Sequence, residues 1–167
     1  MRLGVYAGSF DPVTVGHLAV IDKASALVDR LVVVVAVNPD KRTWFTLEER
    51  VQLLRQSLPS RVEVTSTTGW VVNLARDLGA TWLFRGVRDG TDAEAELKLA
   101  AINASIAPEV TTVFITADPR LVEVSSSRLK AEAEAGHDLA GLCPPAVARA
   151  LAVALERRDG RGASGTS

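Results

Sequence analysis

Runs of apolar residues alternate along the chain with segments in which apolar residues recur every three or four positions. The longest run, residues 31–37, reads Leu-Val-Val-Val-Val-Ala-Val, which is typical of a strand buried on both faces of a sheet. The recurring pattern predicts helices instead. We predict strands over residues 3–7, 31–37, 62–66, 81–84 and 111–116. We predict helices over residues 16–28, 71–78, 91–106, 125–135 and 145–155, and one more after Thr46.

Local signals mark the ends of two of these helices. Thr46 and Glu49 have the spacing of a capping box, in which each side chain accepts a backbone N–H at the start of a helix. Gly79 follows the helix over residues 71–78. Glycine tolerates the left-handed conformation that ends many helices, so we expect that helix to stop there.

The alternation of strands with helices predicts an α/β fold. We expect a doubly wound, Rossmann-like sheet of five parallel strands with helices on both faces, in a single domain over residues 1–156. Residues 157–167 are rich in Gly, Ser and Arg and are predicted to be a disordered tail. Ligands of such sheets bind beyond the carboxyl ends of the strands. The loops of interest are therefore residues 8–16, 38–45, 67–70, 85–91 and 117–127.

Charge and cysteine content narrow the function classes. The net charge is −1, which disfavours a nucleic-acid-binding module, so an anionic ligand must meet a local cluster of charge. Cys143 is the sole cysteine, which excludes a disulfide framework and a thiolate metal cage and fits a reducing cytoplasm. The apolar start of the chain breaks at Gly8, too early for a signal peptide or a membrane span. We expect a cytoplasmic protein that binds neither membrane nor nucleic acid.

The loop after the first predicted strand carries the strongest chemical signal. Gly8 permits a sharp turn, Ser9 offers a hydroxyl and a backbone N–H, and Gly16 opens a helix whose N-terminus suits an anion. His17 lies in the first turn of that helix, within reach of the same anion. No lysine follows in P-loop spacing, and the glycines do not fit the dinucleotide fingerprint. We interpret the loop as a phosphate site of another kind.

This loop and a second segment resemble the two signatures of the nucleotidyltransferase superfamily. Residues 8–12, Gly-Ser-Phe-Asp-Pro, with Gly16 and His17 resemble the (T/S)xGH signature. Residues 124–127, Val-Ser-Ser-Ser, with Lys130 resemble I-S-S-S-x-x-K. Motif order and spacing both agree with the superfamily.

Two further segments are similar to the bacterial phosphopantetheine adenylyltransferases, and the resemblance covers residues 3–155. These segments are residues 45–50, Phe-Thr-Leu-Glu-Glu-Arg, and residues 85–88, Arg-Gly-Val-Arg. The resemblance implies adenylyl transfer from ATP to 4′-phosphopantetheine, which gives dephospho-CoA and pyrophosphate. The protein would supply no nucleophile; it would position two polyanions and neutralise the charge that develops between them.

The resemblance also implies roles for individual residues. His17 would donate to the α-phosphate, Lys41 would bridge the two reacting phosphates, and Arg85 would hold the acceptor phosphate; these three are the expected catalytic residues. No metal-ligating residues are expected, because Mg²⁺ would be held by phosphate oxygens and water. A homohexamer is also implied. The implied ATP-binding residues are Ser9, Phe10, His17, Gly86, Val87, Arg88, Glu96, Leu121, Val122, Glu123, Val124, Ser125, Ser126 and Ser127. The implied acceptor-binding residues are Ser9, Lys41, Val71 and Arg85.

The sequence departs from that family in two segments. Residues 93–96 read Ala-Glu-Ala-Glu, where the family has two aromatics, and residues 121–123 read Leu-Val-Glu in place of an aromatic pair. Glu123 would place a negative charge near a polyphosphate. These changes keep open a nucleotidyltransferase of the same fold with another acceptor or nucleotide, such as a cytidylyltransferase. A catalytically silent nucleotide-binding protein is a further alternative. The three tryptophans, Trp44, Trp70 and Trp82, are expected to pack rather than react, although Trp70 lies in the loop that would line the pantetheine arm.

Overall fold

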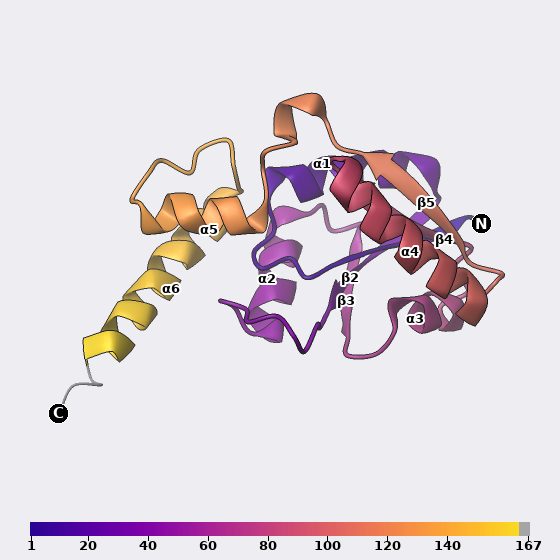
Figure 1. Ribbon diagram of the computed structural model, residues 1–167, viewed down its shortest axis with the longest axis horizontal. Helices are drawn as coiled ribbons and strands as arrows, with labels where there is room; N and C mark the ends of the chain where they lie inside the picture. Colours follow the sequence, from indigo (N-terminus) through magenta and orange to yellow (C-terminus); the bar gives the residue numbers. More distant parts are fainter. Residues whose placement is uncertain (164–167) are drawn as a thin grey trace.

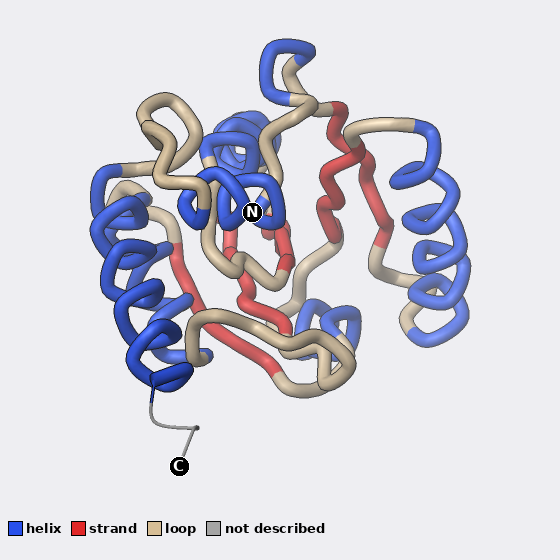
Figure 2. The backbone as a smooth tube through the Cα atoms, turned by 60° about the vertical axis from the view of Figure 1, so that its left-hand side comes forward, coloured by secondary structure: helices blue, strands red, loops and turns tan. Residues whose placement is uncertain are grey.

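The computed structural model describes the backbone of residues 1–163 and the side chains of residues 1–160. Five parallel strands form one sheet in the order β3-β2-β1-β4-β5, and helices lie on both of its faces (Figures 1 and 2). The predicted single-domain, doubly wound α/β fold is confirmed. The strands are β1 (Leu3–Gly8), β2 (Arg30–Ala36), β3 (Glu63–Thr67), β4 (Trp82–Val87) and β5 (Thr111–Thr116). The helices are α1 (Val15–Leu27), α2 (Leu47–Ser57), α3 (Val71–Asp77), α4 (Gly90–Ile106), α5 (Ser126–Glu134) and α6 (Pro145–Ala163), with a 3₁₀ turn at Pro119–Leu121.

Strand β2 is buried on both faces, as its continuous apolar run predicts. Val33 and Val35 belong to the cluster beneath α1, α2, α5 and α6. Val32 and Val34 belong to the cluster beneath α3, on the opposite face. Successive side chains of a strand point to opposite faces, so an apolar residue is needed at every position of this strand.

The predicted helix signals are confirmed. Thr46 Oγ1 accepts the N–H of Glu49 at 3.2 Å, and the Glu49 carboxylate accepts the N–H of Thr46 at 2.9 Å. Gly79 has a φ of +74° directly after α3. Helix α2 therefore begins, and helix α3 ends, where the local sequence predicts.

Strand β4 is longer than predicted. It runs to Val87, so Arg85, Gly86 and Val87 lie in a strand and not in the expected loop over residues 85–91. Each of the three pairs with a residue of β5, from Phe114 to Thr116. The sequence did not predict this extension, because Arg85 and Gly86 are not residue types typical of strands.

Helix α6 also extends beyond its predicted end. The expected tail began at residue 157, but α6 continues to Ala163; residues 164–167 lie outside the described residues. Arg157 forms an ion pair with Glu49 at 2.7 Å, and the guanidinium of Arg158 lies 4.3 Å from the centre of the Trp44 ring. These contacts come from residues more than 100 positions away, so the Gly- and Arg-rich composition does not reveal them. Within the part of the chain that the structure describes, no helix has the length and apolarity needed to span a membrane.

Candidate active site

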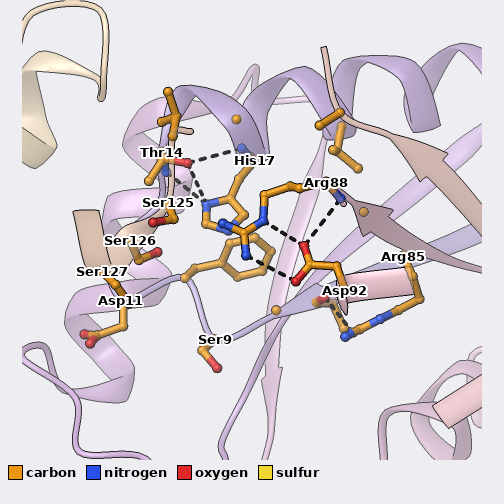
Figure 3. Close-up of a pocket in the computed structure, with 18 of the residues that line it drawn as sticks. Ser9, Asp11, Thr14, His17, Arg85, Arg88, Asp92, Ser125, Ser126 and Ser127 are labelled. Carbon is orange, nitrogen blue, oxygen red and sulfur yellow. Dashed lines mark hydrogen bonds and ion pairs between the residues drawn. The ribbon is translucent and has the colours of Figure 1, made fainter. Parts of the chain in front are cut away.

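A cavity of about 560 Å³ opens where the chain order of the strands reverses, between β1 and β4. Open α/β sheets bind their ligands at this position. Figure 3 shows the cavity with labelled side chains from residues 9–17, 85–92 and 125–127 around it. Most of the site residues expected from the sequence line it: Ser9, Phe10, His17, Lys41, Arg85, Gly86, Val87, Arg88, Glu96, Leu121, Val124, Ser125, Ser126 and Ser127.

The imidazole of His17 is fixed in one tautomer by the start of α1. The backbone N–H of Thr14 donates to His17 Nδ1 at 3.0 Å, and the Thr14 hydroxyl lies 3.1 Å from the same nitrogen (Figure 3). Because a backbone N–H can only donate, Nδ1 must accept. The neutral ring therefore carries its hydrogen on Nε2.

Two neighbours keep the His17 ring in place and uncharged. The ring of Phe10 meets it edge-on, with 5.0 Å between the ring centres, and Phe10 has a φ of +46°, which is uncommon outside glycine. Burial, and then the positive charge of Arg88, lower the pKa of His17 to about 4. His17 is thus a neutral Nε2–H donor at physiological pH.

Arg85 and Glu96 form a close ion pair inside the cavity. Arg85 Nε and Nη2 donate to the two carboxylate oxygens of Glu96, both at 2.6 Å, and Nη1 donates to the Ala7 carbonyl at 3.0 Å. These bonds use three of the five N–H groups of a guanidinium. Two N–H groups remain for a ligand, while Glu96 has both oxygens engaged and acts on the cavity through Arg85.

Arg88 is held in the same manner by a residue that the sequence did not single out. Its Nε donates to Asp92 at 2.8 Å, in the first turn of α4, and Figure 3 shows the pair beside His17. The Asp92 hydrogen bond raises the pKa of Arg88, and the same bond lowers the pKa of Asp92. The spacing of four residues is a signal that could have identified the pair.

Two of the three hydroxyls in the serine segment are used for structure. Ser125 caps α5 by accepting the N–H of Arg128 at 3.1 Å, and Ser126 donates to the Pro12 carbonyl at 2.8 Å. Ser126 thereby joins the second signature to the first. The N-terminus of α5 still faces the cavity, and its N–H groups can meet an anion.

Sequence reasoning missed two buried charged residues that support the loop between β1 and α1, namely Asp11 and Arg50. Asp11 accepts backbone N–H groups from Trp44 and Phe45 and pairs with Lys130 at 2.9 Å. Arg50 donates to the Ser9 carbonyl at 2.9 Å. Both residues belong to segments quoted for the resemblance, but their partners lie more than 30 positions away.

Three expected residues do not line the cavity: Val71, Val122 and Glu123. The Glu123 side chain is 84% exposed and lies 3.7 Å from the guanidinium of Arg128. Its charge therefore lies outside the cavity lining, beside Arg128, and still contributes to the raised pKa of Arg88. Trp44 and Trp82 pack against the core as predicted; the prediction fails for Trp70, which is 54% exposed.

The fold recurs in solved structures of low sequence identity. A putative nicotinate-nucleotide adenylyltransferase from Vibrio parahaemolyticus superimposes with a TM-score of 0.66 and 16% identity, over 90% of this chain and 99% of that one. A lipopolysaccharide core biosynthesis protein from Thermoplasma volcanium gives a TM-score of 0.53 and 21% identity, over 71% of this chain and 97% of that one. At these identities the similarity concerns the fold.

Sequence comparison is more specific. The cytidylyltransferase-like family matches residues 5–132. A phosphopantetheine adenylyltransferase from Brucella anthropi is 41% identical over 158 residues, which cover 90% of this chain and 96% of that protein. One from Limosilactobacillus fermentum is 40% identical over 161 residues, with coverage of 95% and 93%. The chain thus belongs to the phosphopantetheine adenylyltransferase family of nucleotidyltransferases.

Proposed function

We propose that the protein transfers the adenylyl group of ATP to 4′-phosphopantetheine, producing dephospho-CoA and pyrophosphate. The observation that carries this proposal is the neutral Nε2–H of His17 in a cavity that also contains Lys41, Arg85 and the N-terminus of α5. Those groups suit a reaction between two phosphates. The names of the relatives support the same substrates.

The reaction needs no nucleophile from the protein. A phosphate oxygen of the acceptor attacks the α-phosphorus of ATP, a new P–O bond forms, and the bond to the bridging oxygen breaks. The electron pair of that bond leaves with pyrophosphate. Catalysis then depends on positioning and on the neutralisation of negative charge in the transition state.

Each of three side chains has a distinct task in this proposal. His17 donates its Nε2–H to a non-bridging oxygen of the α-phosphate, where negative charge increases during attack. Lys41, which is exposed at the rim of the cavity, bridges the two reacting phosphates. Arg85 holds the acceptor phosphate with the two N–H groups that Glu96 and Ala7 leave unused.

The nucleotide lies along the carboxyl end of β4 and the start of α5 in this proposal. The N–H groups of residues 125–127 meet the β- and γ-phosphates. Gly86 sits close to α1: a Cβ there would lie 3.3 Å from the Val20 side chain and 3.5 Å from the Tyr6 hydroxyl. The pantetheine arm extends toward Val71 and Trp70, outside the cavity lining.

We propose MgATP as the form of the nucleotide substrate. Among the described residues, no group of three or more His, Cys, Asp or Glu side chains could hold a metal ion. The three carboxylates that line the cavity, Asp11, Asp92 and Glu96, are each paired with a basic side chain. The magnesium ligands would therefore be phosphate oxygens and water.

The activity is tested by incubating the protein with Mg²⁺, 4′-phosphopantetheine and each of ATP, CTP, GTP and UTP, and measuring pyrophosphate. We expect release with ATP alone, loss of release when EDTA is added, and recovery with excess Mg²⁺. Release with CTP and not ATP would instead identify a cytidylyltransferase. No release with any nucleotide would contradict the proposed acceptor.

We further propose a homohexamer in the cytoplasm. Support for assembly comes from large apolar side chains left exposed on α4 and β5, namely Leu97 at 59%, Ile102 at 44% and Phe114 at 37%. Within α4 itself, the buried residue is Asn103. A helix with apolar residues on its outer side is typical of a subunit contact.

A further inference from the structure

Asp11 is a carboxylate placed where two polyanions are proposed to bind. It lines the cavity, yet it is only 5% exposed, and in Figure 3 its oxygens point away from His17. A buried carboxylate needs charged or hydrogen-bonding partners. Those partners reveal what the side chain does.

The carboxylate of Asp11 joins three segments of the site. Asp11 itself belongs to the loop between β1 and α1, which leads to His17. Its oxygens accept the N–H groups of Trp44 at 3.1 Å and Phe45 at 3.0 Å, at the end of the loop that carries Lys41. The ammonium of Lys130, on the helix that begins at the serines, donates to it at 2.9 Å.

The Lys41 loop depends on this junction for its position. Residues 40–43 are exposed, and Lys41 is bonded through its backbone N–H to the Asn38 carbonyl at 3.1 Å. On the other side, the chain is next held at Trp44 and Phe45 by Asp11. A lysine on such a loop reaches a defined phosphate only if both ends of the loop are fixed.

The positive charge of Lys130 compensates the negative charge of Asp11 in a site proposed to bind phosphates. The side chain of Lys130 is 18% exposed and that of Asp11 is 7% exposed, so the pair is poorly screened by solvent. The ammonium also lies 5.6 Å from the centre of the Trp44 ring. The positive charge cancels a negative one that would repel phosphate, and it fastens α5 to the same point.

We infer that Asp11, with Lys130 as its counter-ion, is a positioning residue that holds the Lys41 loop and the start of α5 in register with His17. The expected change in kcat and KM rests on the proposed function. The structural consequence, an ordered Lys41 loop, does not depend on the substrate. The two can therefore be tested separately.

The test compares Asp11→Asn with Asp29→Asn. Asp29 also accepts a backbone N–H and pairs with an arginine, Arg2, but it does not line the cavity. We expect Asp11→Asn to lower kcat about 10- to 100-fold and raise KM for 4′-phosphopantetheine more than KM for ATP. Asp29→Asn should leave both unchanged. Hydrogen exchange over residues 38–45 should accelerate only in Asp11→Asn.

A double-mutant cycle separates positioning from a direct role of Lys130. If Lys130 acts by neutralising and fixing Asp11, the double variant Asp11→Asn/Lys130→Met should be no slower than the slower of its two single variants. Lys130→Arg, which keeps the positive charge, should be faster than Lys130→Met. Independent, multiplying losses would overturn the inference, because Lys130 would then serve the phosphates by itself.

Two further outcomes discriminate among explanations. If Asp11→Asn reduces only the folded fraction, with KM and hydrogen exchange over residues 38–45 unchanged in the folded protein, the inference is wrong. If the exchange accelerates but the wild-type protein does not use 4′-phosphopantetheine, the positioning role stands and the proposed acceptor fails.

Discussion

The side chain of His17 has two nitrogens with separate tasks. Nδ1 accepts the Thr14 N–H and completes the cap of α1, so the element that positions the ring also selects its tautomer. A histidine in the third position of a helix can form such a reciprocal cap much as glutamate does. The structural and the proposed catalytic roles of His17 thus use opposite edges of the ring.

Replacing His17 by alanine should remove one hydrogen-bond donor to the transition state. We expect kcat to fall on the order of 100-fold or more, the usual scale for one such donor. The dissociation constant for ATP should change little, because the donor matters most when charge develops. Steady-state kinetics and calorimetric titration with ATP check both values; an unchanged kcat would exclude His17 from the mechanism.

The protonation of His17 should be visible by nitrogen NMR. Because the pKa is lowered to about 4 from an ordinary value of 6.5, the ring should remain neutral, with hydrogen on Nε2, at pH 5 and above. The unfolded chain binds this proton at higher pH than the folded chain, so His17 reduces stability as pH falls from about 6.5 toward 4. His17→Gln identifies the resonance; a midpoint near 6.5 would contradict the prediction.

At the scale of elements, the end of α6 supports the loop that carries Lys41. Arg158 stacks on Trp44, and Arg157 pairs with Glu49, the residue that completes the cap of α2. Both contacts hold the beginning of the Gly- and Arg-rich segment against the rest of the protein. They also connect the last helix to the end of the loop that carries Lys41.

The double variant Arg157→Ala/Arg158→Ala removes both contacts and the exposed ion pair of Arg158 with Glu134 at 3.6 Å, and should destabilise the protein modestly. A partly exposed cation–π contact and exposed ion pairs together contribute about 1–2 kcal/mol. In a protein of this size, that corresponds to a fall in Tm of roughly 2–8 °C. Thermal unfolding measures it, with Arg149→Ala, exposed on the same helix, as the control. Equal effects in both variants would contradict the specific role of these contacts.

At the scale of the whole molecule, the doubly wound sheet brings separate phosphate-binding segments to one edge. Carboxylates already engage two of the three arginines that line the cavity: Glu96 holds Arg85, and Asp92 holds Arg88. These two cations are therefore in place before any ligand binds. Such preorganisation reduces the cost of ordering side chains when the substrates arrive.

The proposed hexamer makes a prediction about mass. The wild-type protein should have six times the chain mass of 17.8 kDa, and Leu97→Glu should shift it to smaller species because a charge would enter an apolar contact. Sedimentation or light scattering measures this. Val153→Glu, at a position 45% exposed on α6, is the matched control. Dissociation by Val153→Glu alone would place the contact on another surface.

The sequence by itself determined the features that local patterns encode. The order of strands and helices, the doubly buried β2 and the cap at Thr46 follow from residue spacing and from backbone chemistry within a few positions. The motif around His17 and the serine segment likewise pointed to the edge of the sheet where the cavity lies. Each of these signals is contained in a short stretch of chain.

Only the tertiary structure decided which groups face one another. The Asp11–Lys130 pair joins residues 119 positions apart, and no spacing rule connects them. The extension of β4 through Arg85 to Val87 required the ladder with β5. These outcomes reflect contact energies between distant segments, which exist only after the chain has folded.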